Sequence, residues 1–259
     1  ADTPASLRVV DGVVIVVSAV DGLQLYTEKV WTAATELDIP KIIFINKVDH
    51  EQADIKSVLE SIKKKFKVDP FCINTAVGTG EKFTGVIDVI SKKFHSYQKD
   101  GSGENKTDAI PDLMAEEVNY SFAELTELVA EVDDGLTENY LENGELSKKE
   151  FDDGFKRGLK EGKLLQVFFG SATQNMGVDL LMDAIIDYFP SPDQRGPVKG
   201  KNPKDSSEKL CKADPKSSLA AFVFKTIADP YAGRLTLFRV FSGVVKSDSS
   251  VYNATQKIV

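Results

Sequence analysis

The sequence predicts an α/β fold: a doubly wound parallel sheet that carries an inserted α+β subdomain and is followed by the start of a β-barrel domain. Three observations lead to this prediction. Short apolar runs alternate with amphipathic helical stretches at both ends of the first 195 residues. Over a hundred residues of a more charged texture separate the second run from the third. After residue 215, alternating runs joined by a short turn are typical of an antiparallel sheet.

Three short apolar runs are predicted to be the buried strands of the sheet. They are Val13–Ala19, Lys41–Asn46 and Leu164–Phe169, and the first is almost entirely β-branched. Strands that are covered on both faces of a parallel sheet have this composition. Helices predicted at Thr27–Leu37 and Val178–Phe189 follow the first and third runs, with apolar residues at helical spacing. This alternation predicts the doubly wound sheet.

The long segment between the second and third strands is predicted to be a subdomain inserted in a loop. A Lys-rich helix comes first, and strand-like runs, a polar loop and acidic helices follow. These elements are expected at Ile55–Phe66, around Phe71–Thr75 and Val86–Ile90, at Lys99–Lys106, and at Asp112–Glu131, Leu136–Glu142 and Ser147–Leu159. Ser147 and Glu150 form a capping box. A charged, solvated appendage is favoured over a segment with a site of its own.

The last part of the chain is predicted to open a second domain. Gly196–Pro215 is rich in Lys, Ser, Gly and Pro, as linkers are. Strands are expected at Leu219–Ala228 and Leu235–Phe241, and Val244–Tyr252 is expected to start a third. Some forty residues do not close a barrel, so we expect an incomplete one.

Composition excludes several classes of protein. The net charge of −8, from 40 acidic against 32 basic residues, argues against free DNA or RNA as a partner of the whole surface, although a local patch can still dock on a ribosome. No apolar run approaches the roughly 20 residues that span a bilayer, and the first residues do not form a secretory signal. Cys72 and Cys211 lie far apart without CxxC spacing. We therefore expect a cytoplasmic location and neither a disulfide framework nor a zinc site. A monomer is also expected.

The sequence Asn46-Lys47-Val48-Asp49 directly follows the second buried strand, where open α/β sheets bind ligands. A carboxylate at Asp49 can accept hydrogen bonds from the N1–H and the exocyclic amine of guanine, whereas adenine leaves it unpaired. The stem of Lys47 can lie along the base, and Asn46 can tie the loop to its neighbours. A four-residue match alone is equally compatible with a polar turn after a strand.

Gly170-Ser171-Ala172 follows the third buried strand and precedes a predicted helix. Small residues here let the backbone approach a base closely, and the N–H of Ala172 can donate to guanine O6. By itself this triplet is typical of an ordinary strand-to-helix turn. Its position on the strand that follows the insertion makes it the expected partner of the Asn46–Asp49 loop.

Several runs together resemble the G domain and the start of domain II of bacterial elongation factor G, a translational GTPase. They cover nearly the whole chain in the family's order. They are LRVVDG from Leu7, VSAVDGLQ from Val17, TEKVW from Thr27, FINKVDH from Phe44, KFTGVIDVI from Lys82, GSATQNMGVDLLMDAIIDYFPSP from Gly170 and FKTIADPYAGRLTLFRVFSG from Phe224. The long insertion and the ADPYAGRL stretch favour elongation factor G or a close paralogue over other classes that share NKxD.

This resemblance implies a P-loop-type GTPase sheet and assigns its parts. The implied domains are 1–66 (first part of the G domain), 67–163 (inserted subdomain), 164–195 (last part of the G domain), 196–218 (linker) and 219–259 (start of barrel domain II). It implies GTP or GDP and Mg²⁺ as ligands and the ribosome as partner. The guanine contacts carry over onto Asn46, Lys47, Asp49, Ser171 and Ala172. In the family a DTPG sequence places its aspartate on the magnesium shell, which here corresponds to Asp2.

Departures from the family pattern concern the phosphate-binding half. The P-loop sequence GxxxxGK[ST] and the switch I threonine are absent, and Ala5 follows Pro4 where the family has glycine and then histidine. The spacing from DTPA to the next strand is also shorter than in the family. Without a P-loop the β- and γ-phosphates lose their main cradle. We therefore assign no catalytic residue and expect that these 259 residues lack catalytic segments.

Three hypotheses follow for the function. The first is a ribosome-dependent GTP hydrolase that couples hydrolysis to translocation, with recycling or ribosome protection as a paralogue's role. The second is a fragment that binds guanine nucleotide or the ribosome without hydrolysis. The third is a degenerate paralogue that uses the fold only for contacts.

Overall fold

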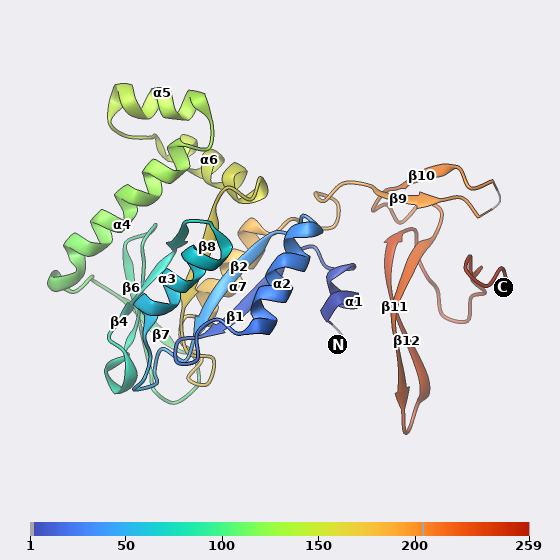
Figure 1. Ribbon diagram of the computed structural model, residues 1–259, viewed down its shortest axis with the longest axis horizontal. Coiled ribbons are helices and arrows are strands. Elements are labelled where there is room, and N and C mark those ends of the chain that lie inside the picture. Colours follow the sequence, from blue (N-terminus) through green and yellow to red (C-terminus); the bar gives the residue numbers. More distant parts are fainter. Residues whose placement is uncertain (1–2, 204, 259) are drawn as a thin grey trace. The chain divides into compact units, whose positions relative to one another are not determined.

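The computed structural model describes residues 3–203 and 205–258. The chain forms two compact units, one of Gly12–Phe189 and one of Ala1–Asp11 with Pro190–Val259 (Figure 1). In the described residues, no helix combines the length and the apolar character needed to cross a membrane.

A four-stranded parallel sheet with strand order β1-β2-β8-β3 is the centre of the larger unit. Its strands are β1 (Val13–Ser18), β2 (Lys41–Asn46), β8 (Leu165–Phe169) and β3 (Pro70–Cys72). Phe44 of β2 pairs with Val16 of β1 on one side and Phe168 of β8 on the other. The predicted fold class, an α/β fold with a parallel sheet, is confirmed.

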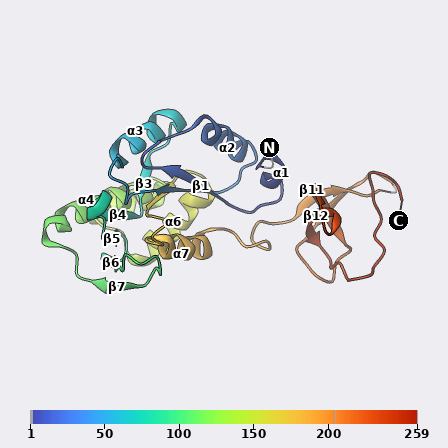
Figure 2. The ribbon, with the colours of Figure 1, turned by 90° about the horizontal axis from the view of Figure 1, so that it is seen from below.

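Helices cover both faces of this sheet. Figure 2 places α2 (Leu25–Glu36) and α3 (Ile55–Phe66) on one side and α6 (Lys148–Lys160) and α7 (Val178–Tyr188) on the other. Alternate residues of each strand therefore enter two different cores. Ile43 and Val167 pack in the core with α2 and α3, and Phe168 packs in the core with α6 and α7. Burial on both faces explains why the strands are continuous apolar runs.

The insertion contains an antiparallel sheet and three helices. The sheet has the order β4-β5-β6-β7, with β4 (Asn74–Val77), β5 (Gly85–Asp88), β6 (Lys93–Tyr97) and β7 (Asn105–Asp108), and a short turn, η1 (Gly80–Lys82), joins β4 to β5. The helices are α4 (Asp112–Ala130), α5 (Asp134–Asn143) and α6. The predicted capping box at the start of α6 is confirmed, with Ser147 and Glu150 each bonding the other's backbone N–H.

The expectation of a single strand around Phe71–Thr75 is wrong. The chain makes two strands there, because β3 joins the central parallel sheet while β4 begins the antiparallel one. The change of partner falls between Cys72 and Asn74. Apolar character identifies a buried strand but carries no information about which sheet it joins, so the sequence pattern merged the two.

In the smaller unit, two hairpins follow the helix α1 (Thr3–Leu7): β9 (Val198–Lys201) with β10 (Glu208–Cys211), and β11 (Ala220–Asp229) with β12 (Gly233–Ser242). The second hairpin confirms the two runs predicted there. The segment expected as a linker, Gly196–Pro215, contains the first hairpin. Because both strands of that hairpin contain lysines, its sequence shows no clear alternation of apolar and polar residues.

The expectation of a third strand at Val244–Tyr252 is also wrong. No strand forms over this range, although Val244, Val251 and Tyr252 are apolar and about half exposed. A β-strand needs a partner strand for its backbone groups, and apolar content alone does not supply one.

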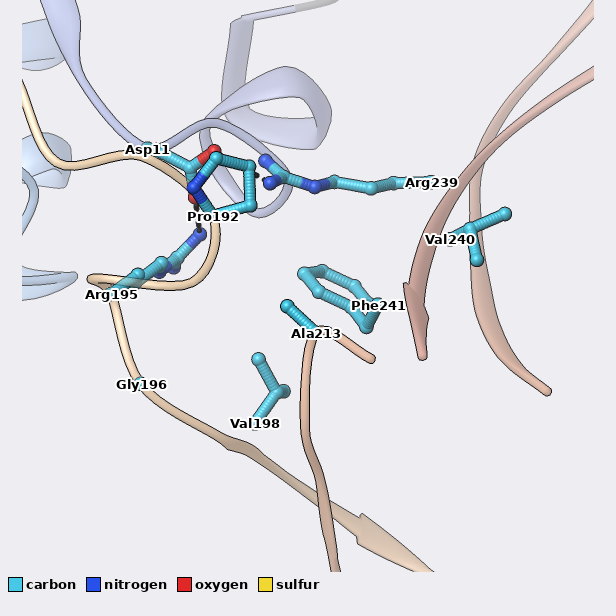
Figure 3. A pocket seen from close by; sticks show the side chains of 9 residues that line it. All are labelled: Asp11, Pro192, Arg195, Gly196, Val198, Ala213, Arg239, Val240 and Phe241. Carbon is cyan, nitrogen blue, oxygen red and sulfur yellow. Dashed lines mark hydrogen bonds and ion pairs between the residues drawn. The ribbon is translucent and has the colours of Figure 1, made fainter. Parts of the chain in front are cut away.

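Asp11 joins three segments of the smaller unit by ion pairs (Figure 3). Its two carboxylate oxygens accept from Arg195 at 2.9 Å and from Arg239 at 2.5 Å, and Arg239 also donates to the carbonyl oxygen of Val9. Pro192 and Phe241 are among the side chains around a cavity of about 20 Å³ beside this network. A cavity of that volume has room for about one water molecule and is too small for a nucleotide.

Gln166 in the middle of β8 is the exception in the central core. Its side chain is fully buried, and neither its amide nitrogen nor its amide oxygen has a hydrogen-bond partner within the described residues. A buried amide without partners costs stability because it gave up hydrogen bonds to water on folding.

We expect Gln166→Met to raise the free energy of unfolding by about 1–2 kcal/mol, since methionine has a similar length and no polar group to desolvate. Urea unfolding followed by circular dichroism measures this change. Gln52→Met at an exposed position is the control and is expected to stay within about 0.5 kcal/mol of the parent. A loss of stability at Gln166 would mean that the amide has a partner in solution.

Candidate functional site

Three loops meet at one edge of the central sheet. They follow the carboxyl ends of β1, β2 and β8, which lie at the same edge because these strands are parallel. In Figure 1 they lie at the lower edge of the larger unit. Most residues selected from the sequence are in the second and third loops.

Asn46 and Ala172 bring the second and third loops together. The side-chain oxygen of Asn46 accepts a hydrogen bond from the Ala172 N–H at 2.8 Å, across 126 positions of sequence. Two backbone bonds support the same junction, from Val48 N–H to the carbonyl of Gly170 and from Gly170 N–H to the carbonyl of Ile45. The structure therefore places the two loops side by side, as their strand positions predicted.

Lys47 is held by the first loop. Its backbone lies in the left-handed region with φ 66°, and its ammonium lies 3.1 Å from a carboxylate oxygen of Asp21. The hydroxyl of Ser18 donates to the same oxygen at 2.7 Å. This hydrogen bond and then the Lys47 ammonium lower the pKa of Asp21, so the carboxylate stays ionised at neutral pH.

The carboxylate of Asp49 is the group of the second loop that is available to bind a ligand. Val48 is fully buried and anchors the turn, while Asp49 itself is half-buried. Within residues 3–203 and 205–258, no hydrogen bond or ion pair engages the Asp49 side chain. A half-buried carboxylate that has no internal partner gains most from a ligand that offers two donors.

The third loop is shaped by close backbone contacts. A Cβ added to Gly170 would lie 2.3 Å from the Met176 carbonyl oxygen and 2.7 Å from the Phe44 ring, so only glycine fits. Ser171 and Met176 exchange two backbone hydrogen bonds of 2.9 and 3.0 Å. The buried Ser171 hydroxyl accepts from the N–H of Gln174, and therefore orders the loop.

The Ala172 N–H, which was expected to donate to a ligand, donates to Asn46 in this structure. The next amide, Thr173 N–H, has no acceptor in the described part of the chain, and Thr173 is exposed. A carbonyl oxygen that approaches this loop can bond Thr173 N–H directly or share the Ala172 N–H with Asn46.

Asn74 is a supporting residue that sequence reasoning missed. Its side chain is fully buried, and it pairs with the backbone of Phe169 through Nδ2 to the carbonyl at 3.1 Å and Oδ1 from the N–H at 2.7 Å. It therefore fixes the last residue of β8 immediately before Gly170. A lone asparagine within the strand-like run around Phe71–Thr75 gave no signal for this role.

Asp2, the residue assigned to magnesium, lies outside the described residues. Within the described residues, no three His, Cys, Asp or Glu side chains gather as a set that could hold a metal ion. The polar groups at the described edge suit a base and not a divalent cation, because Asp21 is engaged with Lys47 and Asp49 is the one carboxylate in the segments Asn46–Asp49 and Gly170–Thr173.

Comparison with known proteins identifies the two parts of the chain. Residues 1–191 match the family described as elongation factor Tu GTP binding domain, and residues 218–259 match elongation factor G domain 2. The chain belongs to the translational GTPases of the elongation factor G type. A crystal structure of a protein from Thermus thermophilus is similar to this elongation factor G-type chain, with a TM-score of 0.78 and 28% identity over 96% of the chain. The chain spans 34% of that protein's length.

Membership of this family indicates which class of ligand this edge of the sheet binds. A GTP binding domain binds guanine nucleotide, and three loops at the carboxyl edge of its parallel sheet are where α/β sheets take their ligands.

We expect Asn74→Ala to lower the free energy of unfolding by about 2–4 kcal/mol, because it leaves both backbone groups of Phe169 buried without partners. Urea unfolding measures the loss. The matched control is Asn119→Ala on the exposed face of α4, expected within about 0.5 kcal/mol of the parent. Equal effects in the two variants would contradict the role assigned to Asn74.

Proposed function

We propose that this chain binds the guanine base of GTP and GDP between the loops Asn46–Asp49 and Ser171–Thr173, and that it serves a translation elongation factor that couples ribosome-stimulated GTP hydrolysis to translocation. The observation that supports this most directly is the half-buried Asp49 carboxylate, which has no partner among the described residues. It follows Asn46, the residue that ties the two loops together.

The chemistry of guanine suits this arrangement. Asp49 accepts from the N1–H and the exocyclic amine of the base, and both bonds are charge-assisted. Adenine offers an unprotonated N1 and no amine at C2, so it leaves the carboxylate desolvated and unpaired. Guanine O6 accepts from the N–H of Thr173 or of Ala172. Selectivity then comes from both loops at once.

Lys47 contributes contact area. Asp21 holds its ammonium at 3.1 Å, and this restrains the methylene stem, which can lie along the flat face of the base. A side chain that is ordered before the ligand arrives loses less entropy on binding. Asn46 acts through the loop, since its bond to Ala172 sets the distance between the two base-binding segments.

The phosphates and Mg²⁺ belong to the part of the proposal that the described residues do not reach. By the family pattern Asp2 contributes to the magnesium shell, and the metal would neutralise charge on the phosphates. The contacts proposed for the base involve none of these groups, so nucleotide binding and hydrolysis can be tested separately.

The role in translocation rests on the match to elongation factor G domain 2 beside the GTP binding domain. Ribosome recycling or ribosome protection by a paralogue is the alternative, together with binding without hydrolysis. GTP hydrolysis measured with and without ribosomes tests the first proposal, which expects stimulation. A translocation assay on programmed ribosomes then separates translocation from recycling. Binding of GDP without stimulated hydrolysis would favour the non-hydrolysing alternative.

We expect Asp49→Asn to weaken GDP binding by about 100-fold and to strengthen binding of xanthosine diphosphate. The amide keeps an acceptor for N1–H but offers a donor where guanine also has one, whereas xanthine has an oxygen at that position. Competition against a fluorescent nucleotide measures both affinities.

The matched control is Asp69→Asn, which changes an exposed carboxylate just before β3 at the opposite edge of the sheet. It is expected to leave both affinities unchanged. An Asp49→Asn protein that binds GDP as the parent does would remove Asp49 from the site.

A further inference from the structure

The inserted sheet touches both loops of the proposed guanine site. On the side of the second loop, Gly80 N–H of η1 donates to the carbonyl oxygen of Val48 at 2.9 Å. Gly80 has φ 59°, and a Cβ there would lie 3.2 Å from Glu51, so this contact also depends on a glycine. The insertion therefore fixes the turn that carries Asp49.

On the side of the third loop, the turn between β6 and β7 lies against Thr173 and Asn175. The amide of Asn175 donates to the carbonyl of Ser102 at 3.2 Å. A Cβ added to Gly103 would lie 2.4 Å from the same amide, and Asn175 itself has φ 54°. The fit is close enough that a displacement of this turn moves the base loop with it.

Tyr97 and Asn105 of the inserted sheet bind Asp179, which lies in the first turn of α7, the helix that follows the base loop. The Tyr97 hydroxyl donates to one oxygen of Asp179 at 2.6 Å, and the Asn105 amide donates to the other at 2.9 Å. Tyr97 is 8% exposed. Burial raises the pKa of Tyr97, and the bond to Asp179 raises it further, so the hydroxyl remains protonated and is the donor.

Asp179 does not cap its own helix, although it lies near the helix start. The N-cap of α7 is Gly177, and no side-chain bond caps it. Both oxygens of Asp179 are instead used by the insertion. A carboxylate in the first helical turn that points its bonds at another sheet fixes the helix, and the loop before it, relative to that sheet.

We infer that the inserted sheet positions the guanine-binding loops, with Tyr97 and Asp179 as the positioning pair for Ser171–Met176. This inference rests on the function proposed above for those loops. It revises the interpretation of the insertion as a solvated appendage, because its β-sheet is part of the support of the base site. Neither Tyr97 nor Asp179 is assigned a contact with the base.

Tyr97→Phe tests this with the smallest change, since it keeps the buried ring and removes only the hydroxyl. We expect about a tenfold loss of GDP affinity and faster amide hydrogen exchange at Ala172, Gln174 and Met176. Asp179→Asn is expected to give a similar loss, and the double variant to be less than additive because both changes remove one interaction.

Asn175→Gly is a second, independent variant. It keeps the left-handed backbone, removes only the bond to Ser102, and does not disturb the core, so it remains informative if Tyr97→Phe proves unstable. Tyr120→Phe is the matched control, because Tyr120 is 65% exposed on α4. Urea unfolding of each variant shows whether a change in affinity exceeds the change in global stability.

Hydrogen exchange separates this inference from the proposed function. If the parent chain binds GDP and Tyr97→Phe changes neither the exchange of the loop nor the affinity, the inference is overturned. Faster exchange with unchanged affinity overturns it as well, since the loop is then not held for the base. If the parent does not bind GDP but exchange in the loop rises, the positioning of the loop stands and the proposed function fails.

Discussion

The hydrogen bond from the Ala172 N–H to Asn46 Oδ1 depends on the order of the parallel sheet and in turn determines the geometry of the candidate site. It joins the ends of β2 and β8, which are adjacent strands with the whole insertion between them in sequence. Neither loop has enough internal contacts to fix its distance from the other. The two halves of a base-binding edge can act together only if this distance is constant, and the Asn46 side chain sets it together with the two backbone bonds of Gly170.

The insertion also supports the carboxyl edge of the central sheet. Asn74 pins the end of β8, Gly80 holds the turn after β2, and Tyr97 holds the start of α7. Each bond contributes only about 0.5–1.5 kcal/mol, but together they restrict a segment whose own sequence is polar and short. The insertion is thus connected to the G-domain sheet by directed bonds, in addition to the covalent connections at its ends.

Much of the fold was predictable because it depends on patterns that are local in sequence. The buried strands and the helices α3 and α7 appear as apolar runs and helical spacing, and the capping box of Ser147 is a local signature. Choice of partner was not predictable in this way. The sequence does not indicate that β3 and β4 join different sheets, or that the expected linker pairs as a hairpin.

The same distinction between local patterns and distant partners applies to the residues of the candidate site. Asn46 and Ala172 were found because strand ends collect at one edge of a parallel sheet, and the structure brings them together. Asp21, Asn74 and Tyr97 act across 26, 95 and 82 positions of sequence, and nothing near them in the chain marks their partners. The acceptor of the Ala172 N–H was not predictable for a related reason, since Asn46 lies far away in sequence.

A loop that recognises a base must keep some polar groups free, and this requirement explains why external support is needed. An N–H reserved for a ligand cannot also stabilise its own loop, and an unpaired carboxylate such as Asp49 favours conformations that expose it to water. Ordering each residue of such a loop costs about 1–2 kcal/mol of conformational entropy. Bonds from a neighbouring sheet can offset this cost without occupying the groups that face the ligand. The inserted sheet meets this condition, because its bonds go to Val48, Asn175 and Asp179 and leave Asp49 and the Thr173 N–H available.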